Sequence, residues 1–306
     1  MAVKKQSITD HYAIYNGDCV SVTGELPEDS IDMAIFSPPF ADLYCYSDDD
    51  RDMGNSKGYD EFFQHFSYLV KNLAKIIKPG RICAVHVMDI PSMKERDGFI
   101  GIKDFSGDMI RAFQKEDFIY HSRHLIWKDP LIEATRTKAL GLMHKQLTKD
   151  STMSRSGLPD YLLAFRMPGE NQEPVTHPDG LTTYCGKERP DATGIKFSHE
   201  TWRKYASPVW MDIRQTRTIE TKMARAPQDE KHICPLQLDV IERACILWSN
   251  PGDKVLTPFM GVGSEVYGAV MNGRKGIGIE LKDSYYKQAE KNLKIAIESG
   301  VDSMLL

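Results

Sequence analysis

The sequence lacks the features that mark secreted, membrane-spanning and zinc-binding proteins. None of its six cysteines belongs to a C-x-x-C pair, so we expect no structural zinc site. No apolar run approaches the roughly 20 residues that cross a bilayer, so we expect no membrane partner. The first residues lack the apolar segment of a signal peptide. We therefore expect a cytoplasmic protein whose cysteines are reduced thiols.

A large excess of one charge is also missing, since the formal net charge of the 306 residues is −4. This value alone argues weakly against a nucleic-acid partner, but binding depends on where the charges lie. Residues 131–157 contain five Lys or Arg and two acidic residues, which gives +3. Residues 42–52 contain five Asp and one Arg. Both stretches fit solvated loops as well as binding surfaces.

Apolar periodicity predicts two ordered regions. Short apolar runs bounded by Pro, Gly or Asn indicate strands, and a spacing of three to four residues indicates helices. The first region contains strands at 12–15, 31–36 and 82–88, with a helix at 59–77. The second contains helices at 236–248, 264–271 and 283–298, with strands at 254–257 and 276–280. This alternation predicts an α/β fold whose mostly parallel sheet has helices on both faces.

The middle of the chain is less regular. Periodicity fades between residues 131 and 230, and residues 167–194 are rich in Pro, Gly, Asn and Thr. We interpret 131–230 as an insertion of loops and short elements. The predicted domains are therefore an α/β domain made of 1–130 and 231–306, and a projecting lobe made of 131–230.

A glycine loop joins the strand at 254–257 to the helix that follows. Gly261 and Gly263 let a ligand approach the backbone, and the helix points its first N–H groups at that ligand. Glu280 ends the next strand, where a carboxylate can accept both hydroxyls of a ribose. The loop lacks G-x-G-x-x-G and the Walker lysine, which argues against a dinucleotide or ATP. The combination favours a nucleoside-containing cofactor, although a glycine turn is also an ordinary connection.

Ser37-Pro38-Pro39-Phe40 follows the strand at 31–36. The two prolines remove two N–H donors, so neighbouring carbonyl oxygens are left to face a ligand. An exocyclic base amine is a poor nucleophile because its lone pair is delocalised into the ring. A hydroxyl from Ser37 and the Pro38 carbonyl could accept its two hydrogens and expose that lone pair, while Phe40 stacks on the base. The alternative is a turn that only ends the strand.

These segments resemble the DNA amino-methyltransferases that use S-adenosylmethionine (SAM), in the circular order called the beta class. In that family the catalytic tetrapeptide precedes the target-recognition region, and the SAM loop follows it. The similarity is collinear over most of the chain. Its segments are 16–19, 26–27, 31–32, 37–40, 78–80, 126–128, 231–232, 234–236, 258–263 and 278–280. The resemblance implies a Rossmann-like SAM-dependent methyltransferase fold with an inserted DNA-recognition lobe, SAM as cofactor, and no metal.

The resemblance also implies a role for each matching residue. The target base would contact Ser37, Pro38, Pro39 and Phe40. The adenine amine of SAM would bind Asp18, its ribose Glu280, and its methionine end Phe259, Gly261 and Gly263. The remaining expected cofactor contacts are Cys19, Thr257 and Ser264. The expected base pocket and DNA surface comprise Trp127, Lys128, Arg136, Lys138, Lys145 and Arg155.

One residue departs from the family pattern. The family usually has Asp-Pro-Phe where this chain has Thr257-Pro-Phe. An acidic contact to the cofactor's ammonium group is therefore missing, or another residue supplies it.

The resemblance implies methylation of double-stranded DNA by base flipping, in the setting of restriction–modification. Serine before Pro-Pro and an aromatic usually accompanies N4 of cytosine, so we expect N4-methylcytosine, with N6-methyladenine as the alternative. A small-molecule methyltransferase would not need the basic insertion, and an inactive DNA-binding homologue would not need an intact Ser37–Phe40. Residues 136–161 are similar to methylases of phages and prophages. The family often forms homodimers, and we expect one here.

Three further side chains have simpler interpretations. His86 lies inside an apolar strand and is predicted to be a satisfied core histidine. Trp127 fits the core as well as a base-pocket wall. His232 and Cys234 offer only two ligands, which do not make a metal site.

Overall fold

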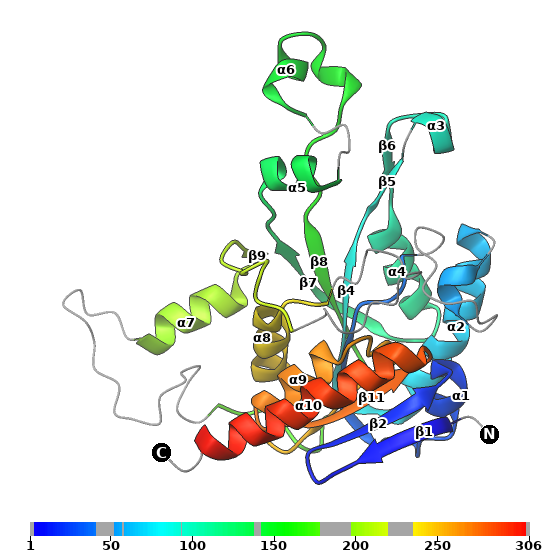
Figure 1. Cartoon of the computed structure of the whole chain (residues 1–306), viewed down its shortest axis with the longest axis vertical. Coiled ribbons are helices and arrows are strands. Elements are labelled where there is room, and N and C mark those ends of the chain that lie inside the picture. Colours follow the sequence, from blue (N-terminus) through cyan, green and yellow to red (C-terminus); the bar gives the residue numbers. More distant parts are fainter. Residues whose placement is uncertain are drawn as a thin grey trace.

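The computed structural model describes residues 3–40, 52–56, 58–92, 94–137, 142–177, 197–219 and 235–303. The larger sheet of these residues has the strand order β1-β2-β11-β10-β3-β4-β8-β7-β9 (Figure 1). Its strands are β1 (Val3–Ile8), β2 (Tyr12–Gly17), β3 (Ile31–Phe36), β4 (Ile77–Met88), β7 (Ile119–Ile126), β8 (Asp160–Arg166), β9 (Val209–Trp210), β10 (Lys254–Thr257) and β11 (Lys275–Glu280). The predicted α/β fold is therefore confirmed.

Five neighbouring strands, β2, β11, β10, β3 and β4, run parallel. The central strand β3 is buried along its whole length, which its apolar run explains. Its side chains alternate between two cores, because Ala34 and Phe36 pack on one face of the sheet and Met33 and Ile35 on the other. The parallel strands all end at the same edge of the sheet, and the connections that leave them gather there.

Helices cover both faces. One face packs against α1 (Cys19–Gly24), α2 (Tyr59–Ile76) and α4 (Phe105–Gln114). The other packs against α8 (Leu238–Trp248), α9 (Ser264–Met271) and α10 (Asp283–Ser303). The apolar residues of α2 recur every three or four positions, so one side of the helix is buried and the other faces water. None of the helices in the described ranges is long and apolar enough to cross a membrane.

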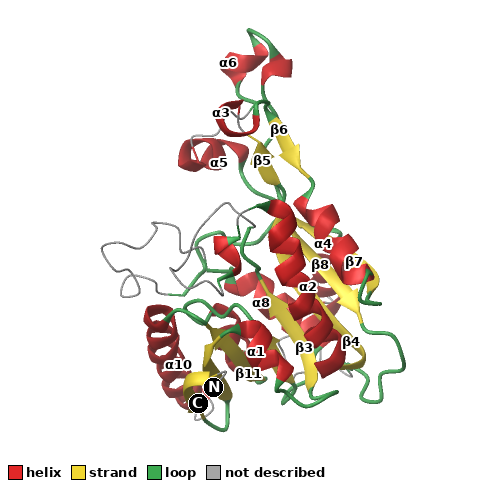
Figure 2. Cartoon of the chain, turned by 90° about the vertical axis from the view of Figure 1, so that its right-hand side faces the viewer, coloured by secondary structure: helices red, strands yellow, loops and turns green. Residues whose placement is uncertain are grey.

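Two arms rise from the carboxyl edge of the parallel strands (Figures 1 and 2). The first follows β4 and contains β5 (Ile90–Ser92), α3 (Lys94–Asp97) and β6 (Gly101–Lys103). The second connects β7 to β8 and contains α5 (Pro130–Thr137), α6 (His144–Leu147) and the short helix η3 (Ser151–Met153). Since β8 is antiparallel to both β4 and β7, it begins at the edge where they end.

The predicted insertion boundary at 131–230 is wrong. β8 lies within that range, yet it occupies the interior of the sheet and pairs with β4 and β7 along its length. β9 also lies within it and pairs with β7. Residues 162–165 are fully buried because β8 is covered on both faces. The part of this range that rises from the carboxyl edge is the second arm, and α7 (Phe197–Ala206) lies between β8 and β9 in the chain.

Candidate active site

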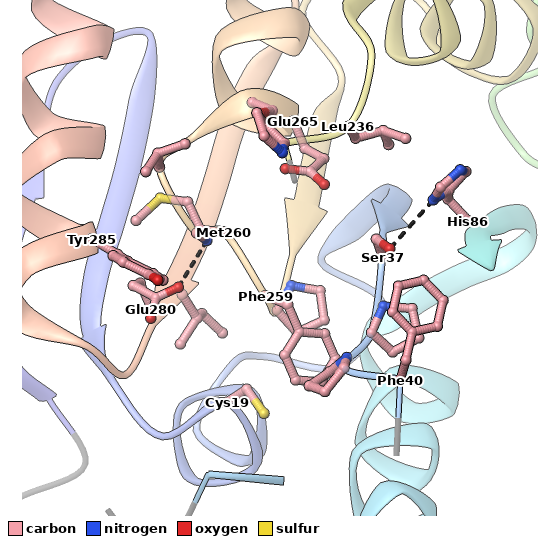
Figure 3. A pocket seen from close by; sticks show the side chains of 18 of the residues that line it. Cys19, Ser37, Phe40, His86, Leu236, Phe259, Met260, Glu265, Glu280 and Tyr285 are labelled. Atoms are coloured by element: carbon pink, nitrogen blue, oxygen red, sulfur yellow. Dashed lines mark hydrogen bonds between the residues drawn. The ribbon is translucent and has the colours of Figure 1, made fainter. Parts of the chain in front are cut away.

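A cavity of about 640 Å³ opens at the carboxyl edge of the parallel strands (Figure 3). Its wall includes residues 17–19 at the end of β2, 37–40 after β3, 258–262 after β10 and 279–282 at the end of β11. In open parallel sheets, ligands bind at this edge, in the crevice that the strand ends form. The volume also falls within the range of about 300–1,000 Å³ that is usual for cofactor sites.

Gly261 and Gly263 shape the loop between β10 and α9. Their φ angles of 54° and 96° lie in the left-handed region, which glycine adopts without strain. A Cβ atom on Gly263 would lie 3.1 Å from the Cβ of Ala289, so this glycine also lets the loop pack against α10. Gly261 lines the cavity, and Gly263 caps the N-terminus of α9 without lining it.

Glu280 holds the glycine loop from the neighbouring strand. Its Oε2 accepts a hydrogen bond of 2.8 Å from the Gly261 amide, and its Oε1 accepts one of 2.8 Å from the Lys282 amide. Burial raises the pKa of Glu280 to about 7, although both amide bonds act in the opposite direction. Each carboxylate oxygen retains a second lone pair, so Glu280 can still accept two hydroxyls. The structure thus brings together the two predicted parts of the cofactor site.

Asp18 and Cys19 lie across the β2–α1 junction. Asp18 is the N-cap of α1, and its Oδ2 accepts hydrogen bonds from the Ser21 amide (2.8 Å) and the Ser21 hydroxyl (2.7 Å). Within the described ranges, Oδ1 of Asp18 has no hydrogen bond. Burial raises the pKa of the Cys19 thiol well above its usual value, so Cys19 is a neutral, packed side chain in the wall.

Ser37, Pro38, Pro39 and Phe40 leave the end of β3 and line the cavity on the side away from Glu280 (Figure 3). Pro38 is buried and the other three are half-buried. The Phe40 ring packs against Phe105 of α4, with centroids 5.9 Å apart, so its position is supported from behind. The predicted tetrapeptide therefore presents a hydroxyl and an aromatic ring to the same space as the glycine loop.

A chain of polar contacts continues from Ser37 into the protein. The Ser37 Oγ lies 3.3 Å from His86 Nδ1, and the other ring nitrogen, Nε2, lies 3.2 Å from Asp160 Oδ2. Lys128 Nζ lies 2.6 Å from the second oxygen of Asp160. Burial acts to raise the pKa of Asp160, but His86 and Lys128 outweigh it and hold that pKa below its usual range. His86 is buried and has polar neighbours at both ring nitrogens, as predicted for a satisfied core histidine, and all four side chains also line the cavity.

Trp127 and Lys128 are neighbours in the chain, but only one of them lines the cavity. Lys128 lines the cavity, as expected for a base-pocket residue. The neighbouring Trp127 is 43% exposed and does not line the cavity, so it belongs neither to the core nor to the cavity wall.

Glu265 is a cavity residue that the sequence did not single out. It lies in the first turn of α9, is only 5% exposed and lines the cavity. Burial raises its pKa to about 8, and the nearby Glu280 carboxylate adds to this rise. Of the expected contacts beside it, Ser264 is buried and lines the cavity. Thr257 is buried without lining it, and its hydroxyl has no hydrogen-bond partner in the described part of the chain.

The predicted DNA-contacting residues lie on the second arm or beyond the described part. Lys145 is exposed on α6. Arg155 is half-buried and donates a 3.0 Å hydrogen bond to the Ser156 carbonyl. Arg136 belongs to α5, but its side chain lies outside what the structure describes, as does the whole of Lys138. Lys145 and Arg155 do not line the cavity.

Three acidic side chains gather at the opposite edge of the sheet: Asp32, Glu173 and Asp253. Two basic side chains already neutralise this cluster. Lys78 Nζ lies 2.7 Å from Asp32, and Arg81 Nη1 lies 3.0 Å from Asp253. The cluster is thus an ion-pair network that ties β3, β4 and the start of β10 together. His232 and Cys234 lie outside the described residues.

A family model described as DNA methylase matches residues 31–291, which include both the tetrapeptide and Glu280. Type II methyltransferase M.BamHI of Bacillus amyloliquefaciens is 23% identical over 282 residues, which cover 91% of this chain and 56% of that protein. The chain therefore spans about half the length of this curated relative.

Two solved structures are similar to the whole described architecture. The structure of the Thermus thermophilus protein TTHA0409, which is described as a DNA modification methylase, was solved in complex with SAM. It is 18% identical, has a TM-score of 0.63, and the match covers 94% of this chain and 96% of that one. The cytosine-N4-specific PvuII DNA methyltransferase is 17% identical with a TM-score of 0.61, and the match covers 96% and 95% of the two chains. At these identities the likeness shows a shared fold.

Proposed function

The chain belongs to the DNA methylase family, and on this premise we propose that it transfers a methyl group from SAM to the exocyclic amine of a base flipped out of duplex DNA. The observation that carries the proposal is a single cavity lined both by the glycine loop with Glu280 and by Ser37–Phe40. A nucleoside site and an amine-binding tetrapeptide in one space can hold a methyl donor beside its acceptor.

The groups in the cavity fit SAM. Glu280 offers acceptors for the ribose hydroxyls, and the uncommitted Oδ1 of Asp18 can accept a hydrogen bond from the adenine amine. The Glu265 carboxyl is buried with no hydrogen bond from another described residue, and a cationic ligand would satisfy it. When bound, SAM supplies an electrophilic methyl group on a sulfonium. TTHA0409, which shares this fold, was solved with SAM.

The tetrapeptide activates the target amine. Ser37 Oγ and the Pro38 carbonyl oxygen each accept one N–H, which draws the nitrogen toward tetrahedral geometry and frees its lone pair. Phe40 stacks on the base and recovers part of the few kcal/mol that leaving the DNA stack costs. The nitrogen then forms its bond to the methyl carbon as the sulfur–methyl bond breaks, and it must lose one proton.

His86 takes that proton through Ser37. In a neutral His86 ring, the Asp160 carboxylate beside Nε2 would hold the proton on that nitrogen, which leaves Nδ1 to accept from the Ser37 hydroxyl. As the amine passes its proton to Ser37 Oγ, the Ser37 hydroxyl proton moves to Nδ1. Asp160 stabilises the resulting imidazolium, because the two groups are 3.2 Å apart and mostly shielded from water.

We propose N4 of cytosine as the target atom, with N6 of adenine as the alternative. The support is Ser37, a short neutral residue before Pro-Pro and an aromatic, together with the fold shared with the cytosine-N4-specific PvuII enzyme. Both amines carry two hydrogens, so both could use the same acceptors. Digestion of the reacted DNA and mass spectrometry of its nucleosides distinguish the two products.

The second arm is the proposed DNA-recognition element. It rises from the edge of the sheet where the cavity opens, and Lys145, Lys149 and Arg155 lie on it (Figure 1). The arm also exposes four large apolar side chains, Leu131, Ile132, Leu147 and Met153. Apolar side chains that gather on an exposed surface mark an interaction site. Basic and apolar side chains on one arm suit the backbone and the base edges of a duplex.

The expected homodimer and the similarity to phage methylases stay predictions.

Transfer of labelled methyl groups tests the proposal. The purified protein is incubated with methyl-labelled SAM and unmethylated duplex DNA, and label is counted in precipitated DNA. We expect incorporation that Ser37→Ala abolishes. Label in DNA excludes an inactive homologue. Label that appears only in added small molecules or proteins would identify the rival methyltransferase class.

A further inference from the structure

One acidic side chain of the cavity is bonded only to its own backbone. Glu265 is 5% exposed, its carboxyl accepts a hydrogen bond from its own amide, and no hydrogen bond or ion pair joins it to another residue of the described ranges. Glu280 differs, because it holds two backbone amides and so stabilises the glycine loop. A buried carboxyl without an ionic partner destabilises a fold, and such groups are found where a ligand provides the missing charge.

The cavity as a whole favours a cation. Its described lining contains six acidic side chains, namely Asp18, Asp52, Glu133, Asp160, Glu265 and Glu280, and two basic ones, Lys128 and Lys282. Lys128 is already paired with Asp160. Even when Glu265 and Glu280 are protonated, the other four acidic groups outnumber the two basic ones, so the cavity attracts positively charged ligands. SAM carries two positive centres, its sulfonium and its α-ammonium, and one carboxylate.

The position of Glu265 indicates whether its carboxyl faces the sulfonium or the α-ammonium of SAM. Figure 3 shows Glu265 on a different wall from Glu280, with Ser37 and Phe40 on a third side. The ribose belongs at Glu280, and the methyl-bearing sulfonium must face Ser37 and Phe40. Glu265 follows directly after the glycine loop in the first turn of α9, which leaves it beside the remaining part of the ligand, the amino-acid end.

We propose that Glu265 binds the α-ammonium group of SAM and so positions the methionine end of the cofactor. This inference rests on the proposed function, since it assigns a subsite of the same cavity. Thr257, at the end of β10, is neutral and does not line the cavity, so it cannot supply the charge. In the absence of ligand, burial keeps Glu265 largely protonated at neutral pH, and the ammonium would shift it to the carboxylate.

Three ligands and two matched variants test the assignment by calorimetry. SAM has the sulfonium and the ammonium, S-adenosylhomocysteine has only the ammonium, and 5′-methylthioadenosine has neither. All three share the adenosine part. Glu265→Gln replaces the carboxyl by a neutral group of the same shape, and Glu280→Gln does the same at the ribose site.

We expect Glu265→Gln to weaken SAM and S-adenosylhomocysteine about 10- to 100-fold, as for loss of a charge-assisted hydrogen bond, and to leave methylthioadenosine unchanged. Glu280→Gln should weaken all three. Unchanged methylthioadenosine binding also shows that Glu265→Gln is folded.

Equal losses for all three ligands in Glu265→Gln, or no loss for any, would overturn the ammonium assignment while leaving the SAM site in place. Loss for SAM but not for S-adenosylhomocysteine would overturn it in favour of a sulfonium contact. Failure of the unaltered protein to bind any of the three would contradict the proposed function itself.

Discussion

His86 Nδ1 lies 3.3 Å from Ser37 Oγ, while the opposite nitrogen of the same ring lies 3.2 Å from Asp160. The histidine thus connects the first residue of the proposed amine-binding tetrapeptide to a buried carboxylate. β4 supplies His86, β3 leads to Ser37, and β8 begins with Asp160. Adjacent strands of one sheet therefore fix all three groups, which is a more rigid arrangement than three loops would give.

Replacement of His86 should slow turnover without weakening the binding of SAM. His86→Gln removes the proton acceptor behind Ser37, and loss of a general base lowers kcat about 10²- to 10⁴-fold. SAM affinity should stay unchanged, because His86 lies on the Ser37 side of the cavity, away from Glu280. His121→Gln, at an exposed position on β7, is the control and should keep full activity. A His86→Gln variant that lost SAM binding and turnover in parallel would indicate a packing role.

Asp160 should matter for stability as well as for activity. Asp160→Asn leaves the Lys128 ammonium, which is only 14% exposed, without its partner, and breaking a buried pair in this way costs about 3–5 kcal/mol. Urea unfolding measures the loss. The double variant Asp160→Asn, Lys128→Met removes both charges and should recover most of the lost stability. If the double variant were no more stable than the single one, the ion pair would not be the source of the effect.

The ligand-free protein should lose stability as the pH rises from about 4.3 to about 8. The pKa values of Glu280 and Glu265 are raised to about 7 and about 8, well above their values in an unfolded chain. Between the unfolded and folded pKa values the folded state binds more protons than the unfolded state, so this contribution is fully present below pH of about 4.3, declines as the pH rises, and is lost once the pH passes 7 to 8. Thermal unfolding between about pH 4 and 9 should show the decline and a level region above about pH 8. Glu265→Gln should flatten it, and an equally steep decline in that variant would contradict the assignment.

Basic residues of the second arm should set the salt dependence of DNA binding. Each phosphate contact releases condensed counterions, so Lys145→Ala with Lys149→Ala should reduce the slope of log K against log salt by about two. The control is Lys291→Ala, on the exposed side of α10. Titration of a labelled duplex at several salt concentrations measures the slope. Equal slopes for the arm variant and the unaltered protein would place the DNA surface elsewhere.

Much of the α/β domain could be predicted from local sequence. The strands at 31–36 and 254–257 and the helix at 264–271 begin and end where predicted. In each case a proline or glycine follows the apolar run within two residues, so the local sequence predicts where the element ends. β8 was missed because its short apolar run stands between the second arm and a Pro- and Gly-rich stretch. Only its pairing with β4 and β7 shows that it belongs to the sheet.

The polar network of the site depends on information that no local pattern holds. His86 meets Asp160 because β4 and β8 pair antiparallel in one particular register, and a shift of one residue would turn either side chain to the opposite face. Glu265 was missed for another reason. An acidic residue in the first turn of a helix is ordinary, and only the burial of α9 beside the cavity makes it unusual.

The identity of the methylated nucleoside tests the central claim most directly. Duplex DNA is reacted with the protein and methyl-labelled SAM, digested to nucleosides and analysed by mass spectrometry, with Ser37→Ala as the parallel sample. We expect labelled N4-methylcytosine from the unaltered protein and none from Ser37→Ala. Labelled N6-methyladenine alone would overturn the cytosine assignment and keep the amine mechanism. Labelled 5-methylcytosine, or DNA without label, would contradict the account.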